Sequence, residues 1–100
     1  MLVYANNAVP ASFNYPHNAV GDNYDSLGIF QQRYIYYPNV AADMSPSGSA
    51  KQFYDQMVAI KGWETMYVPT LCQDVQKSAD PEAYVAHYAA AEKICAAVGY

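Results

Sequence analysis

The sequence predicts a single, mainly α-helical domain, and three observations support this prediction. Hydrophobic residues make up 53% of the 100 residues and charged residues only 14%, which is typical of a folded chain and not of a disordered one. From residue 50 onward, apolar residues recur at helical spacing between residues that begin or end helices. One hundred residues also suffice for one modest core, so we treat 1–100 as one domain.

The first quarter of the chain lacks a regular pattern. Residues 1–25 are rich in Asn, Pro, Tyr and Ala, and Pro10 and Pro16 interrupt regular structure, so we expect an ordered loop that wraps the domain. Residues 26–100 are expected to be mainly helical, beginning with a short helix or helical turn at 26–34. The aromatic run at 34–37 is compatible with a short strand, although no partner strand is evident.

Three longer helices follow in the second half. The first begins at Ala50 and ends at Gly62, and the second covers 71–77 with Thr70 as its N-cap. The third begins at Asp80-Pro81-Glu82, where an N-cap acid precedes a proline at the first helical position. Its buried face is expected to hold residues at spacings of four, three and four: Tyr84, Tyr88, Ala91 and Cys95.

The charge pattern argues against several partners. The net charge is -4, and the five basic residues are scattered, whereas phosphate binding needs clustered cations. Nucleic acid is therefore not expected as a partner. No apolar run approaches the roughly 20 residues of a membrane span, so membrane insertion is not expected either. Because Cys-x-x-Cys and clustered histidines are absent, we expect no metal, and we expect no cofactor.

Tyrosine is unusually frequent, with eleven tyrosines against three phenylalanines. Tyrosine rings can stack on sugar faces while their hydroxyls reach water, although many of them can equally line the rim of the core. The low lysine content and the abundant Tyr, Asn and Ser favour a secreted protein. Because Met1-Leu2-Val3 does not resemble a signal peptide, a secreted protein would be present here in a processed form.

The two cysteines allow one disulfide. Cys72 and Cys95 are placed on the inner faces of consecutive predicted helices, and a bond between them would close a loop of about two dozen residues. In the chain-entropy view such a bond stabilises the fold by roughly 3 kcal/mol. The alternative is two buried free thiols.

The richest chemistry lies in the segment 21–33. Asp25 or Ser26 can cap a short helix, and Gly28 leaves room for a close approach of backbone or ligand. Gln31 with its neighbour Gln32 offers donors and acceptors suited to hydroxyl and acetamido groups of a sugar, and Arg33 can hold a carboxylate through two parallel bonds. The alternative is a polar turn followed by the start of a buried helix. Asp22 with Asp25 could also form a carboxylate pair of the glycosidase kind, or simply bond backbone amides.

The same segment carries a family resemblance. Asp25-Ser26-Leu27-Gly28-Ile29-Phe30-Gln31-Gln32-Arg33 resembles a motif of secreted fungal and actinobacterial lysozyme-like proteins, and the similarity extends over almost the whole chain. More distantly, Ser26–Gln31 is similar to the Ser-x-Gly-Leu-Met-Gln segment of lytic transglycosylases and goose-type lysozymes. Further landmarks are Tyr36-Tyr37-Pro38-Asn39, Gly62-Trp63-Glu64-Thr65-Met66, Thr70-Leu71-Cys72-Gln73 and Val75-Gln76-Lys77-Ser78-Ala79. The resemblance implies a lysozyme-like helical domain with these substrate-binding residues: Asp25, Ser26, Gln31, Gln32, Arg33 and Tyr37.

The resemblance also implies what the chain does. Fuller members of the group carry an acidic helix before the segment that matches Leu2-Val3-Tyr4, so we expect this chain to lack the catalytic helix and assign no catalytic residue. Asp80 stands where the group usually has an aromatic residue. The implied function is recognition of a cell-wall glycan with N-acetyl sugars, of the peptidoglycan or chitin type, with hydrolysis only in the complete protein. The alternative is a non-catalytic secreted module that binds glycans or acts as an effector.

Overall fold

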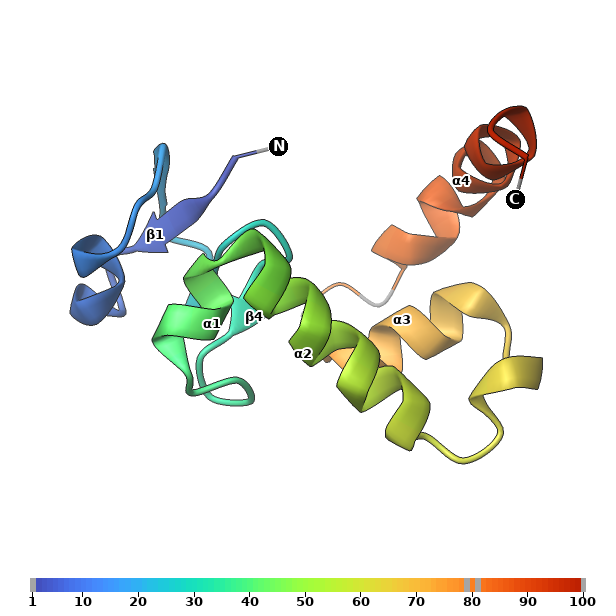
Figure 1. Cartoon of the computed structure of the whole chain (residues 1–100), viewed down its shortest axis with the longest axis horizontal. Coiled ribbons are helices and arrows are strands. Elements are labelled where there is room, and N and C mark those ends of the chain that lie inside the picture. The colour runs from blue at the N-terminus through green and yellow to red at the C-terminus, as the bar shows by residue number, and fades with distance from the viewer. Residues whose placement is uncertain (1, 79, 81, 100) are drawn as a thin grey trace.

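The computed structural model describes residues 2–78, 80 and 82–99 and shows a mainly α-helical chain with two small sheets near its N-terminus (Figure 1). The predicted mainly α class is confirmed, since four α-helices and only short strands are found in those residues. In chain order the elements are β1 (Tyr4–Asn6), the 3₁₀ helix η1 (Pro10–Asn14), β2 (Ala19–Gly21), β3 (Ser26–Leu27), β4 (Gln32–Arg33), α1 (Val40–Met44), α2 (Pro46–Ala59), the 3₁₀ helix η2 (Trp63–Thr65), α3 (Val68–Gln76) and α4 (Ala83–Ala97).

The N-terminal segment is more regular than the ordered loop that we expected. β1 and β2 pair in parallel, with Asn6 opposite Gly21, and η1 lies in the connection between them. The Asn6 side chain is fully buried, where its Nδ2 donates to the Ser26 carbonyl at 3.1 Å and its Oδ1 accepts from the Ala8 N–H at 2.8 Å. A side chain therefore satisfies backbone groups that such short strands leave unpaired.

The core of this N-terminal part is small and unusually polar. Its buried apolar cluster contains Ala5, Val9, Leu27 and Met44. Around that cluster lie buried side chains that can donate or accept hydrogen bonds, and they come from strands, from η1 and from the first two helices: Asn6, Ser12, Ser26, Gln32, Asp43 and Ser49. This core is therefore ordered by side-chain hydrogen bonds as well as by apolar packing.

The helix expected at 26–34 is wrong, because the segment forms a β-hairpin. β3 and β4 pair antiparallel, and the turn between them holds Gly28 at φ 72° and Gln31 at φ 52°. A continuous right-handed helix cannot contain these left-handed residues. The Gly28 N–H donates to the Tyr4 carbonyl at 2.9 Å, which ties the hairpin to β1. The aromatic run at 34–37 forms turns and no strand, since the Tyr37 N–H bonds back to the Arg33 carbonyl at 2.9 Å.

α2 and α3 are found close to the positions expected for the first two long helices, and the short helix α1 precedes them. α1 is capped by the Asn39 side chain, which accepts from the Ala42 N–H at 3.1 Å. α2 begins at Pro46, four residues before the predicted start, because Ser45 caps it through the Gly48 N–H at 3.1 Å. α3 likewise begins at Val68, before the predicted Thr70 cap. These starts are marked by Ser-Pro and Val-Pro steps and not by the first apolar stripe residue.

The last helix differs most from its prediction. α4 begins at Ala83, after the Glu82 N–H bonds the Asp80 side chain at 3.2 Å, and Pro81 lies outside the described residues. The expected buried face is only partly correct: Tyr84 and Tyr88 are half-buried, whereas Ala91 and Cys95 are exposed. α4 packs against α3, and Figure 1 shows its second half extending away from the rest of the chain. None of the helices, within the described residues, has the length and apolar character needed to cross a membrane.

Candidate functional site in a pocket beside the β3–β4 hairpin

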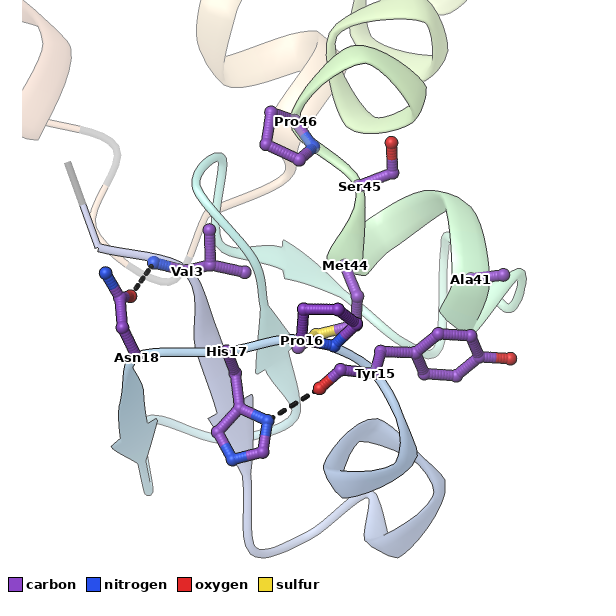
Figure 2. Close-up of a pocket in the computed structure, with 9 residues that line it drawn as sticks. All are labelled: Val3, Tyr15, Pro16, His17, Asn18, Ala41, Met44, Ser45 and Pro46. Carbon is purple, nitrogen blue, oxygen red and sulfur yellow. Dashed lines mark hydrogen bonds between the residues drawn. The ribbon is translucent and has the colours of Figure 1, made fainter.

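The structure contains a large apolar cavity away from the predicted site. It has a volume of about 540 Å³, and in Figure 2 residues 15–18 form one wall and the junction of α1 with α2 forms the other. Two of its polar side chains bond the backbone, because His17 Nδ1 lies 2.7 Å from the Tyr15 carbonyl and Asn18 Oδ1 accepts from the Val3 N–H at 2.7 Å. None of the six predicted substrate-binding residues, all of which the structure describes, lines this cavity.

A smaller pocket of about 170 Å³ brings together half of the predicted residues. Ser26, Gln31 and Arg33 reach it from the hairpin, and the opposite wall comes from the end of α3, the α3–α4 connection and the first turn of α4. The remaining lining residues were not singled out for binding from the sequence: Asn23, Tyr24, Phe30, Gln76, Ser78, Asp80 and Tyr84. We call this the hairpin pocket and take it as the candidate site.

The turn of the hairpin is pressed against α1, which fixes the position of Gln31. A Cβ atom placed on Gly28 would lie 2.0 Å from the Asp43 carbonyl oxygen, so only glycine fits there. Gln31 follows in a left-handed conformation, and its Nε2 donates to the Gly28 carbonyl at 3.1 Å. The side-chain oxygen of Gln31 has no partner among the described residues, which leaves an amide acceptor at the pocket wall.

Arg33 is held in place by an acid and by aromatic rings. Its Nε donates to Asp25 Oδ1 at 2.5 Å, and this hydrogen bond raises the pKa of the guanidinium. The guanidinium lies 4.9 Å from the Tyr24 ring centre and 5.8 Å from that of Tyr36, and the Lys77 ammonium lies 4.8 Å from Tyr36. The terminal nitrogens of Arg33 make no other hydrogen bond to the described residues, so they remain for a ligand.

Asp25 therefore orients Arg33 and does not face the pocket itself. Its second oxygen accepts from the Ile35 N–H at 3.1 Å, so both carboxylate oxygens are engaged. The predicted carboxylate pair is not formed, because Asp25 is occupied in this way while Asp22 is exposed in the preceding loop. The acid that lines the hairpin pocket, within the described residues, is Asp80.

Gln76 supplies a buried and unsatisfied polar atom at the pocket. This residue is 5% exposed, and its Nε2 donates to the Phe30 carbonyl at 2.5 Å, which joins α3 to the hairpin. Its Oε1 is buried and has no hydrogen-bond partner among the described residues. Burying an acceptor without a partner costs about 1–3 kcal/mol, and a ligand donor in the pocket would remove that cost. Burial also raises the pKa of the neighbouring Tyr84, which keeps its hydroxyl protonated.

Two predicted binding residues, Gln32 and Tyr37, use their polar atoms in hydrogen bonds within the protein. Gln32 is fully buried, and its Nε2 donates to the Ser49 carbonyl at 2.9 Å while its Oε1 accepts from Gln52 at 2.9 Å. Tyr37 is buried as well, and its hydroxyl donates to the Val75 carbonyl at 2.6 Å. Neither residue lines the hairpin pocket, and Tyr37 instead lines a separate pocket of about 270 Å³ together with Asn39 and Gln52.

A second internal group is the buried acid Asp43. Its Oδ1 accepts from Gln52 at 2.8 Å, but its Oδ2 has no partner among the described residues. Burial raises the pKa of Asp43 to about 6. A raised pKa is a property of general acids in glycosidases. Asp43 nevertheless lies behind Gly28, lines neither pocket and cannot reach a ligand.

The predicted disulfide is not present, since Cys72 and Cys95 are both free thiols. α3 and α4 run antiparallel, and the rings of Tyr67 and Tyr88 meet at 5.3 Å where α3 begins. From that level Cys72 lies five residues along α3 and Cys95 seven residues along α4 in the opposite direction. This places them about 15 Å or more apart along the helix axes, whereas a disulfide needs Cα atoms within about 7 Å. Across the described part of the chain, no group of three or more potential ligands is placed to hold a metal ion.

Neither a protein-family model nor a curated protein matches this chain. Any functional conclusion therefore depends on the pocket itself.

Proposed function

We propose that the hairpin pocket binds one N-acetyl sugar unit of a cell-wall glycan. The observation that carries this proposal is the buried acceptor Gln76 Oε1 in a pocket that also offers the Gln31 amide and the Ser26 hydroxyl. Sugar hydroxyl and acetamido N–H groups are the donors that such acceptors bind. The volume of about 170 Å³ is below the roughly 300–1,000 Å³ of pockets for drug-sized ligands. It therefore suits a single sugar of a longer chain.

Aromatic rings at the entrance support the same ligand. The Tyr24 side chain is 61% exposed beside the pocket, and its ring is oriented by Arg33. An exposed ring of this kind can stack on the apolar face of a sugar. The cell-wall origin of the sugar is proposed from the resemblance of residues 25–33 to lysozyme-like proteins. A cell-wall ligand also implies a site of action outside the cell.

Binding without hydrolysis is the activity that we propose for these 100 residues. Hydrolysis of a glycosidic bond needs a general acid with a raised pKa beside the scissile oxygen. Asp43 has such a pKa but is enclosed, and Asp25 is engaged with Arg33. Asp80 lines the pocket but is exposed to solvent and accepts a hydrogen bond from the Glu82 N–H.

Titration calorimetry with an N-acetylglucosamine oligomer tests the binding proposal. We expect Gln31→Ala and Tyr24→Ala each to weaken binding about five- to thirtyfold, the equivalent of roughly 1–2 kcal/mol. Gln56→Ala and Tyr54→Ala are matched controls, because both residues are exposed on α2 and away from the pocket. The fully deacetylated oligomer should bind more weakly than the acetylated one. Equal effects of site and control variants, or no binding by the parent chain, would contradict the proposal.

A further inference from the structure

α4 is apolar on nearly every side, yet none of its side chains is buried. The charged residues within Ala83–Ala97 are Glu92 and Lys93. A helix that is apolar all round normally belongs in a protein interior. Here Ile94 is 64% exposed and Val98, directly after the helix, is 63% exposed. The first half of α4 packs on α3, and the second half extends past it (Figure 1).

The surface area of the chain indicates how much is left uncovered. A compact monomer of 11.1 kDa is expected to expose about 5,700 Å². This chain exposes 6397 Å², an excess of roughly 700 Å² over that expectation. Its radius of gyration of 14.1 Å also exceeds the value of about 13 Å for a compact chain of 100 residues. The excess is close to the roughly 800 Å² that each partner buries in a protein–protein interface of standard size.

The exposed face of α4 alternates small and large side chains, so it can pack against the same face of a second copy. Ala91, Ile94, Cys95 and Val98 continue the stripe of Tyr84 and Tyr88, and all four are exposed. In this order the stripe alternates small, large, small and large. If two such stripes run antiparallel about a point between Ile94 and Cys95, Ala91 faces Val98 of the second copy and Ile94 faces its Cys95. Each small residue then meets a large one, as interdigitating packing requires.

We propose that α4 is the interface of a homodimer in which two α4 helices pack antiparallel through this stripe. A two-fold axis brings the same patch of both subunits together, which a self-complementary stripe satisfies. The charge distribution permits contact through this face. The chain carries a net charge of -4, so two copies repel, but the four stripe residues carry no ionised group. Contact through the stripe therefore buries no charge and keeps the other carboxylates in solvent.

Sedimentation equilibrium of the whole chain tests the dimer. We expect a mass of twice 11.1 kDa at high micromolar protein and a shift to monomer on dilution. Ile94→Glu should weaken dimerisation at least tenfold. Ala96→Glu is the matched control, because it adds the same charge to the opposite side of the same helix and should leave dimerisation nearly unchanged. A parent chain that stays monomeric at all concentrations overturns the proposal. The same result would follow if a different protein covers the stripe, and the homodimer would be wrong in that case as well.

Thiol cross-linking tests the antiparallel register. In a Cys72→Ser background, Cys95 lies within one residue of the proposed axis, so mild oxidation should join two copies through this residue. Lys93→Cys in a Cys72→Ser, Cys95→Ser background places an exposed thiol on the far side of α4 and should give little cross-linked dimer. Circular dichroism shows whether each variant keeps its helices. Equal cross-linking at both positions would overturn the proposed arrangement.

Discussion

Residues 4–49 and α4 differ in the kind of side chain that they bury. The first region buries polar side chains such as Asn6 and Ser12 completely, and both bond backbone groups of the short strands and turns around them. α4 is far more apolar and buries no side chain. The difference follows from backbone hydrogen bonding. Short strands and turns leave N–H and C=O groups that polar side chains must satisfy, whereas a long helix satisfies its own. Which side chains are buried therefore depends on the backbone groups that need hydrogen bonds and on the segments available to pack against, and not on hydrophobicity alone.

The largest expected effect comes from the turn of the hairpin, in the region with the polar core. Gly28→Ala places a Cβ 2.0 Å from the Asp43 carbonyl oxygen in a left-handed conformation, so the hairpin must move away from α1. We expect a loss of about 3 kcal/mol or more in the free energy of unfolding, measured by urea denaturation. Gly62→Ala is the control, because Gly62 has φ 83° but no atom within 4 Å of the added Cβ. It should cost only about 1–2 kcal/mol for the left-handed backbone. Equal losses would show that the close contact with α1 does not matter.

The next effect concerns Asp43 and depends on pH. Burial raises its pKa from 3.8 to about 6, so the folded state binds a proton more tightly than the unfolded state does. The protonated carboxyl is favoured in the fold. The contribution of Asp43 to the free energy of unfolding is therefore greatest below pH 4, falls as the pH rises from about 4 to 6, and stays low at higher pH.

Asp43→Asn removes this titration and isolates its contribution. The rise of about 2 in the pKa corresponds to about 3 kcal/mol. As the pH rises from 4 to 7, the unfolding free energy of the variant should therefore increase by about that much relative to that of the parent. The measurement is the difference in unfolding free energy between variant and parent at each pH. Asp55→Asn, on an exposed face of α2, is the control and should show little change. A difference that does not vary with pH would contradict the assignment to Asp43.

The smallest effect is expected in α4. Ile94→Ala should change the unfolding free energy of dilute, monomeric protein by no more than about 0.5 kcal/mol, because the side chain is 64% exposed. Leu27→Ala, the comparable truncation in the buried cluster, should cost about 2–5 kcal/mol. Thermal melts at low protein concentration measure both. A large loss for Ile94→Ala in the monomer would mean that α4 is packed more closely than this structure shows.

The sequence predicted some parts of the candidate site and missed others for a clear reason. Ser26, Gln31 and Arg33 were identified because polar side chains clustered within a short segment. Gln76 and Tyr84 complete the pocket from elements about fifty residues away, and nothing local marks them as partners of the hairpin. The Val75-Gln76-Lys77-Ser78-Ala79 landmark was the one available signal for Gln76. Gln32 was misjudged because an amide suited to a sugar is equally suited to a buried carbonyl such as that of Ser49.

The sequence by itself determined the helical class of this protein and the approximate positions of α2, α3 and α4, because spacing, caps and prolines act within a few residues. It also indicated that Gly28 leaves room for a close approach of backbone, which the Asp43 carbonyl makes in the structure. Only the tertiary structure decided that 26–34 is a hairpin, that Asp25 serves Arg33, and that Cys72 and Cys95 lie too far apart to bond. These outcomes depend on contacts between distant segments, such as Gly28 with Tyr4 and Gln76 with Phe30, which local periodicity does not encode.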